Sequence, residues 1–167
     1  MTLSQLNKLS QKELEPELQK CCGSTTWVKN LSAIFPVSSL DDLLDQSDKI
    51  WNDCTGADAR EAFSHHPKIG DLSSLKEKFA ATSEWAAGEQ DGVQNTTTQV
   101  MEAFVESNQA YEDKFGFIFI ISANGKLAEE MLSLLTLRLL NSPENEIRIA
   151  MEEQNKITRL RLKKLVS

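Results

Sequence analysis

The 167-residue sequence lacks the features that mark several large classes of protein. Seven Gly and four Pro are too few for a collagen-like or low-complexity chain. No run of 18 or more apolar residues is present, so no membrane-spanning helix is predicted. The N-terminal residues lack the basic and apolar regions of a secretory signal, and the last three residues are not a peroxisomal tripeptide. We therefore predict a cytoplasmic protein with no membrane partner.

Residues that hold metals, disulfides or phosphates are also scarce. The three cysteines, Cys21, Cys22 and Cys54, provide neither a disulfide framework nor the ligand spacing of a zinc site. The adjacent His65 and His66 would point about 100° apart on a helix, so they do not form a metal pair. No glycine-rich phosphate-binding loop occurs. Any catalysis is therefore predicted to be acid–base or electrostatic, with no cofactor and no metal.

The charge balance excludes another class of partner. There are 25 acidic and 18 basic residues, which give a formal net charge of −7, and the sequence pI is about 4.9. A general nucleic-acid binder needs clustered Lys and Arg, so no nucleic-acid partner is predicted. The length suits one ordinary domain, since a domain of about 150 residues buries roughly 70 % of its unfolded surface. We expect a single domain over residues 1–167.

Apolar residues recur at helical spacing through nearly all of the sequence. The segments Ser38–Asp41 and Thr55–Asp58 resemble helix-capping boxes, and Ser142 followed by Pro143 is typical of a helix start. The stretch Leu127–Leu140 is apolar on most sides and is predicted to be the most buried helix. These patterns predict an all-α fold, a single compact helical domain of about eight helices. The helices are expected at 3–8, 10–20, 25–34, from the first capping signal to Trp51, from the second to Pro67, at 100–115, at 127–140 and at 143–165.

One segment departs from this periodicity. Phe117–Ile121 is β-branched and aromatic, and its propensity is that of a strand. A lone strand leaves its backbone groups unpaired, and no partner strand is evident. We expect a buried segment, either extended or helical. If it is extended, its backbone donors and acceptors could line a ligand site.

His66 is the first candidate for chemistry. It lies three residues after Phe63 and seven after Ala59, so it continues the apolar face of its helix, and Pro67 follows it. A histidine here could simply pack against the core. It could also face a cleft as a general acid or base, because histidine titrates near neutral pH. Glu89 and Gln90, between two glycines, could likewise bind a ligand or be ordinary solvated surface.

Arg161 is the second candidate. With Ile147 at the zero of a helical wheel, Gln154 falls at about −20° and Arg161 at about −40°, whereas Arg159 falls at about 120°. An inward-facing guanidinium is costly unless it is paired. Arg161 could therefore form a buried ion pair, or it could bind an anionic substrate through parallel hydrogen bonds. Arg138, on another apolar helix, is the runner-up for the second role.

Taken in order along the chain, these motifs resemble the OHCU decarboxylase family, which acts on 2-oxo-4-hydroxy-4-carboxy-5-ureidoimidazoline in urate breakdown. The resemblance covers nearly the whole sequence. The matching motifs are His66–Gly70, Glu89–Gln90, Tyr111–Phe119, Arg138–Leu139 and Arg161–Leu162.

The resemblance implies a cofactor-independent helical carboxy-lyase, usually a homodimer, that releases CO2 from a small anionic substrate to give (S)-allantoin. It implies that His66 is the catalytic histidine and Glu89 its acidic partner. The family often has Ser three residues before this Glu, whereas this sequence has Ala86, so the hydroxyl contact is missing or comes from another group such as Ser83. The positions implied to contact substrate are Pro67, Gln90, Phe119, Ile120, Ile121, Ser122, Ala123 and Arg161.

Two rival hypotheses remain at this point. The chain could be a non-enzymatic helical module that binds a partner through an apolar groove. It could also be a different small-molecule lyase or hydrolase on the same scaffold, since a fold does not determine a function.

Overall fold

A computed structural model describes residues 1–67 and 98–167. The chain divides into two compact units: unit 1 comprises Met1–His66 with Met151–Ser167, and unit 2 comprises Pro67–Ala150. In the described ranges all regular structure is helical, which confirms the predicted all-α class. That the whole chain is a single domain stays a prediction. The helices are α1 (Leu3–Leu6), α2 (Gln11–Gln19), α3 (Thr25–Ser32), α4 (Leu40–Asn52), α5 (Gly56–Ser64), α8 (Thr98–Phe115), α9 (Ala128–Arg138) and α10 (Pro143–Leu165).

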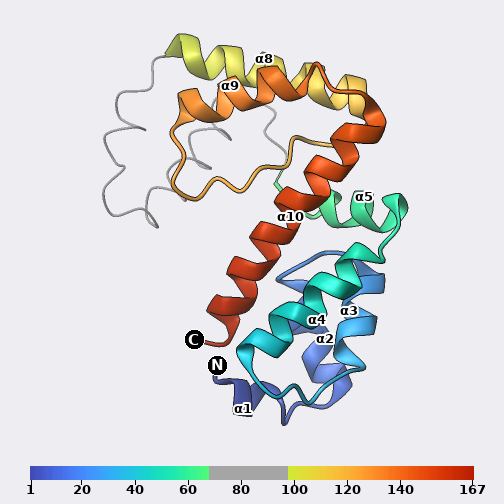
Figure 1. Cartoon of the computed structure of the whole chain (residues 1–167). Coiled ribbons are helices and arrows are strands. Elements are labelled where there is room, and N and C mark those ends of the chain that lie inside the picture. The colour runs from blue at the N-terminus through green and yellow to red at the C-terminus, as the bar shows by residue number, and fades with distance from the viewer. Residues whose placement is uncertain (68–97) are drawn as a thin grey trace. The chain divides into compact units, whose positions relative to one another are not determined.

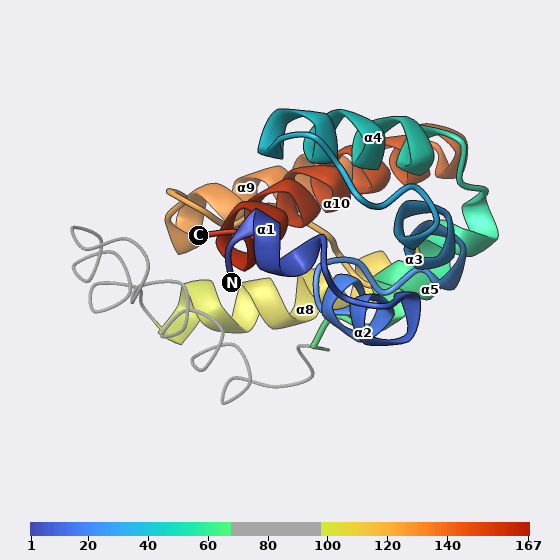
Figure 2. The same cartoon turned by 90° about the horizontal axis from the view of Figure 1, so that it is seen from below.

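Unit 1 is built around α3, which packs against α2, α4 and α5 (Figure 1). The helices bury one apolar face each, as their periodicity predicts. Both ends of the chain belong to this unit and lie next to each other (Figures 1 and 2), where the amino terminus donates to the carbonyl oxygen of Ser167 at 3.3 Å. The fully buried apolar side chains of the unit include Leu6, Leu14, Leu18, Trp27, Leu31, Leu43, Phe63 and Leu162.

The C-terminal part of α10 is anchored to α4 within unit 1. The indole Nε1 of Trp51 donates to the carbonyl oxygen of Met151 at 2.9 Å. One turn further along, Asn155 Nδ2 donates to Asp48 Oδ1 at 2.9 Å, and Arg159 forms an ion pair with the same carboxylate at 2.5 Å. These contacts fix which face of α10 points toward the rest of the unit.

The predicted helix starts are confirmed. The Ser39 hydroxyl accepts from the backbone N–H of Asp42 at 3.0 Å. Thr55 and Asp58 form a reciprocal capping box at the start of α5. Pro143 is the first residue of α10, where its missing N–H costs no helical hydrogen bond.

Unit 2 packs α8 against α9. The prediction that Leu127–Leu140 is the most buried helix is wrong: Leu137 is 62 % exposed and Leu140 is 80 % exposed. The apolar residues of this stretch occupy several faces of a helix, and the described part of the unit covers one of them. Its buried residues are Ala128, Met131, Leu135 and Arg138.

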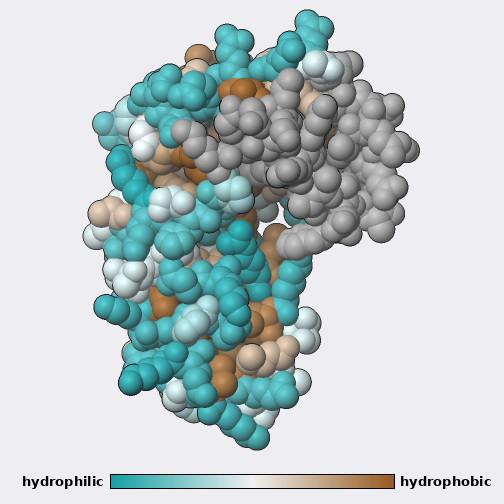
Figure 3. Space-filling model, turned by 180° about the vertical axis from the view of Figure 1, so that it is seen from behind, coloured by the Kyte–Doolittle hydropathy of each residue, from teal (hydrophilic) through white to brown (hydrophobic). Residues whose placement is uncertain are grey.

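The visible surface of the described residues is mostly hydrophilic, with smaller separate hydrophobic areas (Figure 3). Among the described residues, no helix is long and apolar enough to cross a membrane.

Candidate functional site

The end of α5 places the two histidines. Helix α5 ends at Ser64, and His65 is its C-cap. His66 follows the helix end. Its backbone N–H donates to the carbonyl oxygen of Phe63 at 3.1 Å, and its side chain is half-buried. The ring Nε2 of His66 lies 2.6 Å from Oε1 of Gln154 on α10. The ring is therefore held by a specific polar contact rather than only packed against apolar neighbours.

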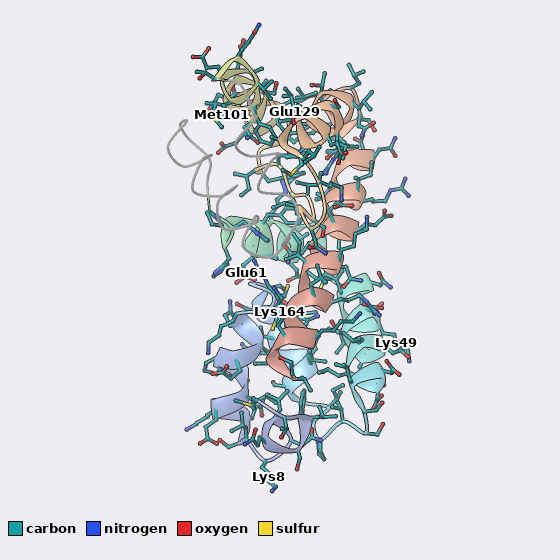
Figure 4. The ribbon with its side chains drawn as sticks, turned by 90° about the vertical axis from the view of Figure 1, so that its left-hand side faces the viewer. Lys8, Lys49, Glu61, Met101, Glu129 and Lys164 are labelled. Atoms are coloured by element: carbon teal, nitrogen blue, oxygen red, sulfur yellow. The ribbon has the colours of Figure 1, made fainter. Side chains whose placement is uncertain are left out.

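Helix α5 is itself held in place by α3. The Glu61 carboxylate (labelled in Figure 4) accepts from the hydroxyl of Thr25 at 2.6 Å and from its backbone N–H at 2.9 Å. These hydrogen bonds lower the pKa of Glu61, because they stabilise the ionised carboxylate. The Thr26 hydroxyl donates to Asp58 at 2.7 Å, one turn earlier on α5. Two charge-assisted contacts thus fix the direction in which the helix delivers His66.

The chain between α2 and α3 lies beside both His65 and Arg161. Arg161 Nη1 donates to the carbonyl oxygens of Lys20 and Cys21, each at 3.4 Å. A few residues later, a Cβ placed on Gly23 would come within 2.5 Å of Cγ of His65. Only glycine therefore fits at this position with His65 where it is.

The Arg161 guanidinium is half-buried, and its contacts are with backbone carbonyls. No carboxylate within residues 1–67 and 98–167 lies within 4.0 Å of it. Its positive charge opposes the effect of burial on the neighbouring thiol: burial raises the pKa of Cys21 to about 11, and Arg161 limits that rise. Lys164, labelled one turn further along α10 in Figure 4, adds a second positive charge to this end of the helix.

The structure therefore does not show the buried ion pair that sequence reasoning allowed for Arg161. That pair belongs to Arg138, the runner-up. Arg138 is 8 % exposed, and its Nη2 lies 2.6 Å from Oε1 of the fully buried Glu146. Tyr111 donates to the same oxygen at 2.5 Å, and Asn141 Nδ2 donates to Oε2 at 2.9 Å. Burial, and then the bond to Glu146, raise the pKa of Tyr111 far above its usual value.

The Arg138 pair supports the segment that sequence reasoning could not assign. Residues 117–123 are neither helix nor strand, and Phe119, Ile120 and Ile121 are each at least 93 % buried. Arg138 Nη1 donates to the carbonyl of Ile120 at 2.7 Å, and its guanidinium lies 4.6 Å from the ring centroid of Phe119. This cation thus provides a hydrogen-bond donor for one buried carbonyl of the segment.

Three backbone N–H groups within this segment have no partner among the described residues. Among the described residues, Phe119, Ile120 and Ile121 donate no backbone hydrogen bond. Buried N–H groups are nearly always paired, so these three donors are candidates for contacts with a ligand. The Ser122 carbonyl accepts from Lys126 Nζ at 2.9 Å, and Ala123 is half-buried beside it.

The predicted site residues fall into three groups. His66 and Arg161 belong to unit 1: His66 contacts Gln154 on α10, and Arg161 lies on the same helix, about two turns further along. Pro67, which is exposed, and residues 119–123 belong to unit 2. The predicted Glu89 and Gln90, together with Ala86 and Ser83, lie outside the described residues.

Sequence reasoning missed two polar residues of the site. Gln154 is fully buried and Thr158 is 2 % exposed, and both lie on the apolar face of α10. A polar side chain on an otherwise apolar helix face is the signal that could have identified them. In the described part of the chain, no three potential metal-ligating residues lie together.

The fold and site define a class: a small helical protein whose last helix carries an arginine and contacts a histidine from another helix end. Comparison with known proteins names the family. A sequence model described as OHCU decarboxylase matches residues 7–163, which span both units, so the chain belongs to this family.

Individual relatives support the same family assignment. The chain is 38 % identical over 155 residues to the uric acid degradation bifunctional protein TTL of Arabidopsis thaliana, covering 92 % of this chain and 47 % of that protein. It is 24 % identical to the 2-oxo-4-hydroxy-4-carboxy-5-ureidoimidazoline decarboxylase of Haloferax volcanii, covering 97 % of this chain and 94 % of that protein. The chain thus spans less than half the length of the bifunctional relatives it matches.

A solved structure shares the fold. It is a crystal structure of OHCU decarboxylase in the presence of (S)-allantoin, with a TM-score of 0.73 and 36 % identity, covering 90 % of this chain and 96 % of that one.

Proposed function

We propose that this chain is a carboxy-lyase that converts 2-oxo-4-hydroxy-4-carboxy-5-ureidoimidazoline (OHCU) to (S)-allantoin and CO2 in urate degradation, without a cofactor. Family membership over residues 7–163 supports the reaction class. The observation in the structure that carries the proposal is Arg161, a half-buried guanidinium held by backbone carbonyls, on the helix that His66 also contacts. A guanidinium with remaining donors suits a carboxylate substrate.

The substrate's own chemistry explains how such a site suffices. Its ring carbon 4 carries both the hydroxyl and the carboxylate, and a C=N bond lies next to it. When the bond to the carboxylate breaks, CO2 leaves, the electron pair forms a double bond between carbons 4 and 5, and the former imine nitrogen takes up a proton, which gives an enol. Loss of the hydroxyl proton and protonation of carbon 5 then give the allantoin ring. The chain therefore needs to bind, orient and move protons, and the substrate supplies the electron sink.

We assign roles on this basis. Arg161 holds the carboxylate-bearing substrate. The family resemblance also implies substrate contacts at residues 119–121. His66, with Glu89 as its acidic partner, takes and returns the proton on one face, which produces one enantiomer. Pro67, Gln90, Ser122 and Ala123 complete the contacts implied by the family resemblance.

The decisive assay uses freshly generated OHCU and follows optically active allantoin by circular dichroism. We expect the signal to appear much faster than in the protein-free control. A rate equal to that of the control would reject the decarboxylase proposal, whatever the state of the fold.

His66 is tested by His66→Gln, with His65→Gln as the matched control on the adjacent, exposed position. Loss of a general acid or base should lower kcat by roughly 10²- to 10⁴-fold, with unchanged far-ultraviolet circular dichroism. The His65 variant should retain most of the activity. Wild-type turnover by His66→Gln would remove this histidine from the mechanism.

The family resemblance also implies a homodimer, and the exposed Leu137 and Leu140 offer an apolar surface for it. Size-exclusion chromatography with light scattering should give the mass of a dimer, and Leu140→Glu should shift it toward the monomer. Cytoplasmic location stays a prediction, which imaging of the tagged chain in its own cell would check.

A binding module without catalysis is the alternative. Allantoin should raise the melting temperature of either an enzyme or a binder, because it would bind only the folded state. Stabilisation by allantoin without OHCU turnover would therefore favour the binding module.

A further inference from the structure

Gln154 is a buried amide that the chemistry above does not use. It is fully buried on α10, its Oε1 lies 2.6 Å from Nε2 of His66, and its Nε2 donates to Oγ1 of Thr158 at 3.2 Å. A buried side-chain amide is costly unless its groups are hydrogen-bonded. The position of these partners also determines which way each proton points.

The orientation of the amide follows from Thr158. The Thr158 hydroxyl has one proton, and its other two partners both act as acceptors of it: the backbone carbonyl of Gln154, one turn earlier, at 3.0 Å, and the sulfur of Cys22. Its oxygen can therefore only accept from the Gln154 side chain. The NH2 group of Gln154 must face Thr158, and its carbonyl oxygen must face His66.

The amide carbonyl in turn determines the tautomer of the ring. A carbonyl oxygen accepts but does not donate, so Nε2 of His66 must carry a proton. In the neutral ring the lone pair then lies on Nδ1. In the imidazolium both nitrogens carry protons, and the bond to Gln154 is kept. Gln154 therefore accommodates both charge states of His66, and these two states differ in whether Nδ1 carries a proton.

We infer that Gln154 and Thr158 are positioning residues that hold His66 as the Nε2–H tautomer, so that Nδ1 is the atom that exchanges protons during the reaction. The structural part of this inference is independent of the substrate. The part concerning turnover rests on the proposed decarboxylase function.

The tautomer can be measured directly, because the chain holds two histidines. Two-bond 1H–15N correlation spectra distinguish Nε2–H from Nδ1–H in a neutral ring, and His65→Gln assigns the remaining signals to His66. At a pH above the titration of the ring, wild type should show Nε2–H. A wild-type spectrum dominated by Nδ1–H, or showing rapid exchange between both forms, would overturn the inference without any activity measurement.

The variants separate positioning from stability. Gln154→Leu removes the acceptor, so the tautomer preference should be lost, and kcat should fall at least about tenfold with KM changed less than about twofold. Gln154→Glu retains an acceptor and adds a negative charge. It should keep the Nε2–H tautomer and shift the pH–kcat profile to higher pH, because a carboxylate beside the ring stabilises the imidazolium.

Thr158→Val removes the group that orients the amide, so it should weaken the tautomer preference, and Thr158→Ser should restore it. Trp51→Phe is the structural control: it removes the indole bond to the Met151 carbonyl on the same helix. It should lower stability and leave the tautomer unchanged. If Gln154→Leu keeps the Nε2–H tautomer, or if Trp51→Phe changes it as much, Gln154 does not position the ring. If Gln154→Leu does not fold, the wild-type spectrum and the Thr158 pair still decide the matter.

The two proposals fail separately. Wild type with the Nε2–H tautomer but without OHCU turnover would reject the function and keep the positioning role. Normal OHCU turnover by Gln154→Leu, with the same tautomer as wild type, would reject the positioning role and keep the function.

Discussion

Arg138 and Arg161 both lie on helix faces whose neighbours are apolar, but their surroundings differ. Arg138 in unit 2 meets the fully buried carboxylate of Glu146 at 2.6 Å and donates to the Ile120 carbonyl at 2.7 Å. Arg161 in unit 1 meets two backbone carbonyls at 3.4 Å and, within the described residues, no carboxylate.

The difference indicates what each arginine is for. A buried pair with short bonds neutralises its own charge, so Arg138 is suited to hold structure. Carbonyl oxygens carry partial charges only, so Arg161 keeps most of its field and is suited to meet an anion. A formal net charge of −7 would repel an anionic substrate over the chain as a whole. A local cation is therefore more informative about function than the overall balance.

The largest expected effect follows from breaking the buried pair. Arg138→Met leaves Glu146 buried without its cation and should lower the free energy of unfolding by about 3–5 kcal/mol. Urea unfolding followed by tryptophan fluorescence measures this. The double variant Arg138→Met with Glu146→Leu should recover much of the loss, because no charge is then left buried. A single variant as stable as wild type would contradict the structural role of the pair.

Replacing the second arginine should separate binding from stability. Arg161→Met should lower kcat/KM for OHCU by roughly 10- to 100-fold, since a hydrogen bond to a charged group is worth about 1.5–3 kcal/mol. Its free energy of unfolding should change by less than about 1 kcal/mol, because its bonds are long and it is half-exposed. Arg159→Met, on the other side of α10, is the matched control and should leave kcat/KM unchanged. Equal losses in both variants would point to helix packing instead.

The close contact of Gly23 with His65 can be tested by adding a side chain at Gly23. Both residues belong to unit 1, as Arg161 does. Gly23→Ala would place a methyl group 2.5 Å from Cγ of His65. We expect it to destabilise unit 1 by about 1–3 kcal/mol, as overpacking does, and to lower OHCU turnover by moving the neighbouring His66. His65→Gly in the same chain should relieve the clash and restore both quantities. Full activity of Gly23→Ala alone would show that the histidine pair tolerates displacement.

The smallest expected effect is a pH dependence in the Arg138 region. Tyr111 is the single tyrosine of the chain, and burial, followed by the bond to Glu146, raises its pKa above the usual value of 10.0. The folded state therefore keeps this proton when the unfolded state loses it. The stability contributed by Tyr111 is fully present below about pH 10 and is lost as the pH rises above it. Absorbance at 295 nm should show no phenolate in folded protein at pH 10.5, whereas protein unfolded in urea should be largely ionised. Equal titration in both states would contradict the buried network.

The sequence predicted the helices well because helix signals are local. The capping residues Ser39, Thr55 and Ser142 act within one turn, and apolar periodicity reports a single packed face. The prediction of burial failed for Leu127–Leu140. Several faces of this helix are apolar, and local spacing does not tell which of them a neighbouring element covers.

Residues 117–123 also show that local sequence does not determine which groups a segment contacts in the folded chain. They have strand propensity, yet they form no strand, and the carbonyl of Ile120 accepts from the guanidinium of Arg138, eighteen residues later. Propensity describes what a segment prefers when a partner strand exists. Which partner is present is a property of the tertiary structure.

For the site, the sequence alone determined the residue types: a histidine on an apolar face before Pro67, an arginine turned inward on the last helix, and an ordered set of motifs that matches one family. It left open which arginine is paired, and it assigned no role to Gln154 or Thr158. Those points depend on contacts between residues 8 to 140 positions apart, such as Arg138 with Glu146, His66 with Gln154 and Arg161 with Cys21. Spacing along one helix reports which way a side chain points. Only the folded chain determines what it meets there.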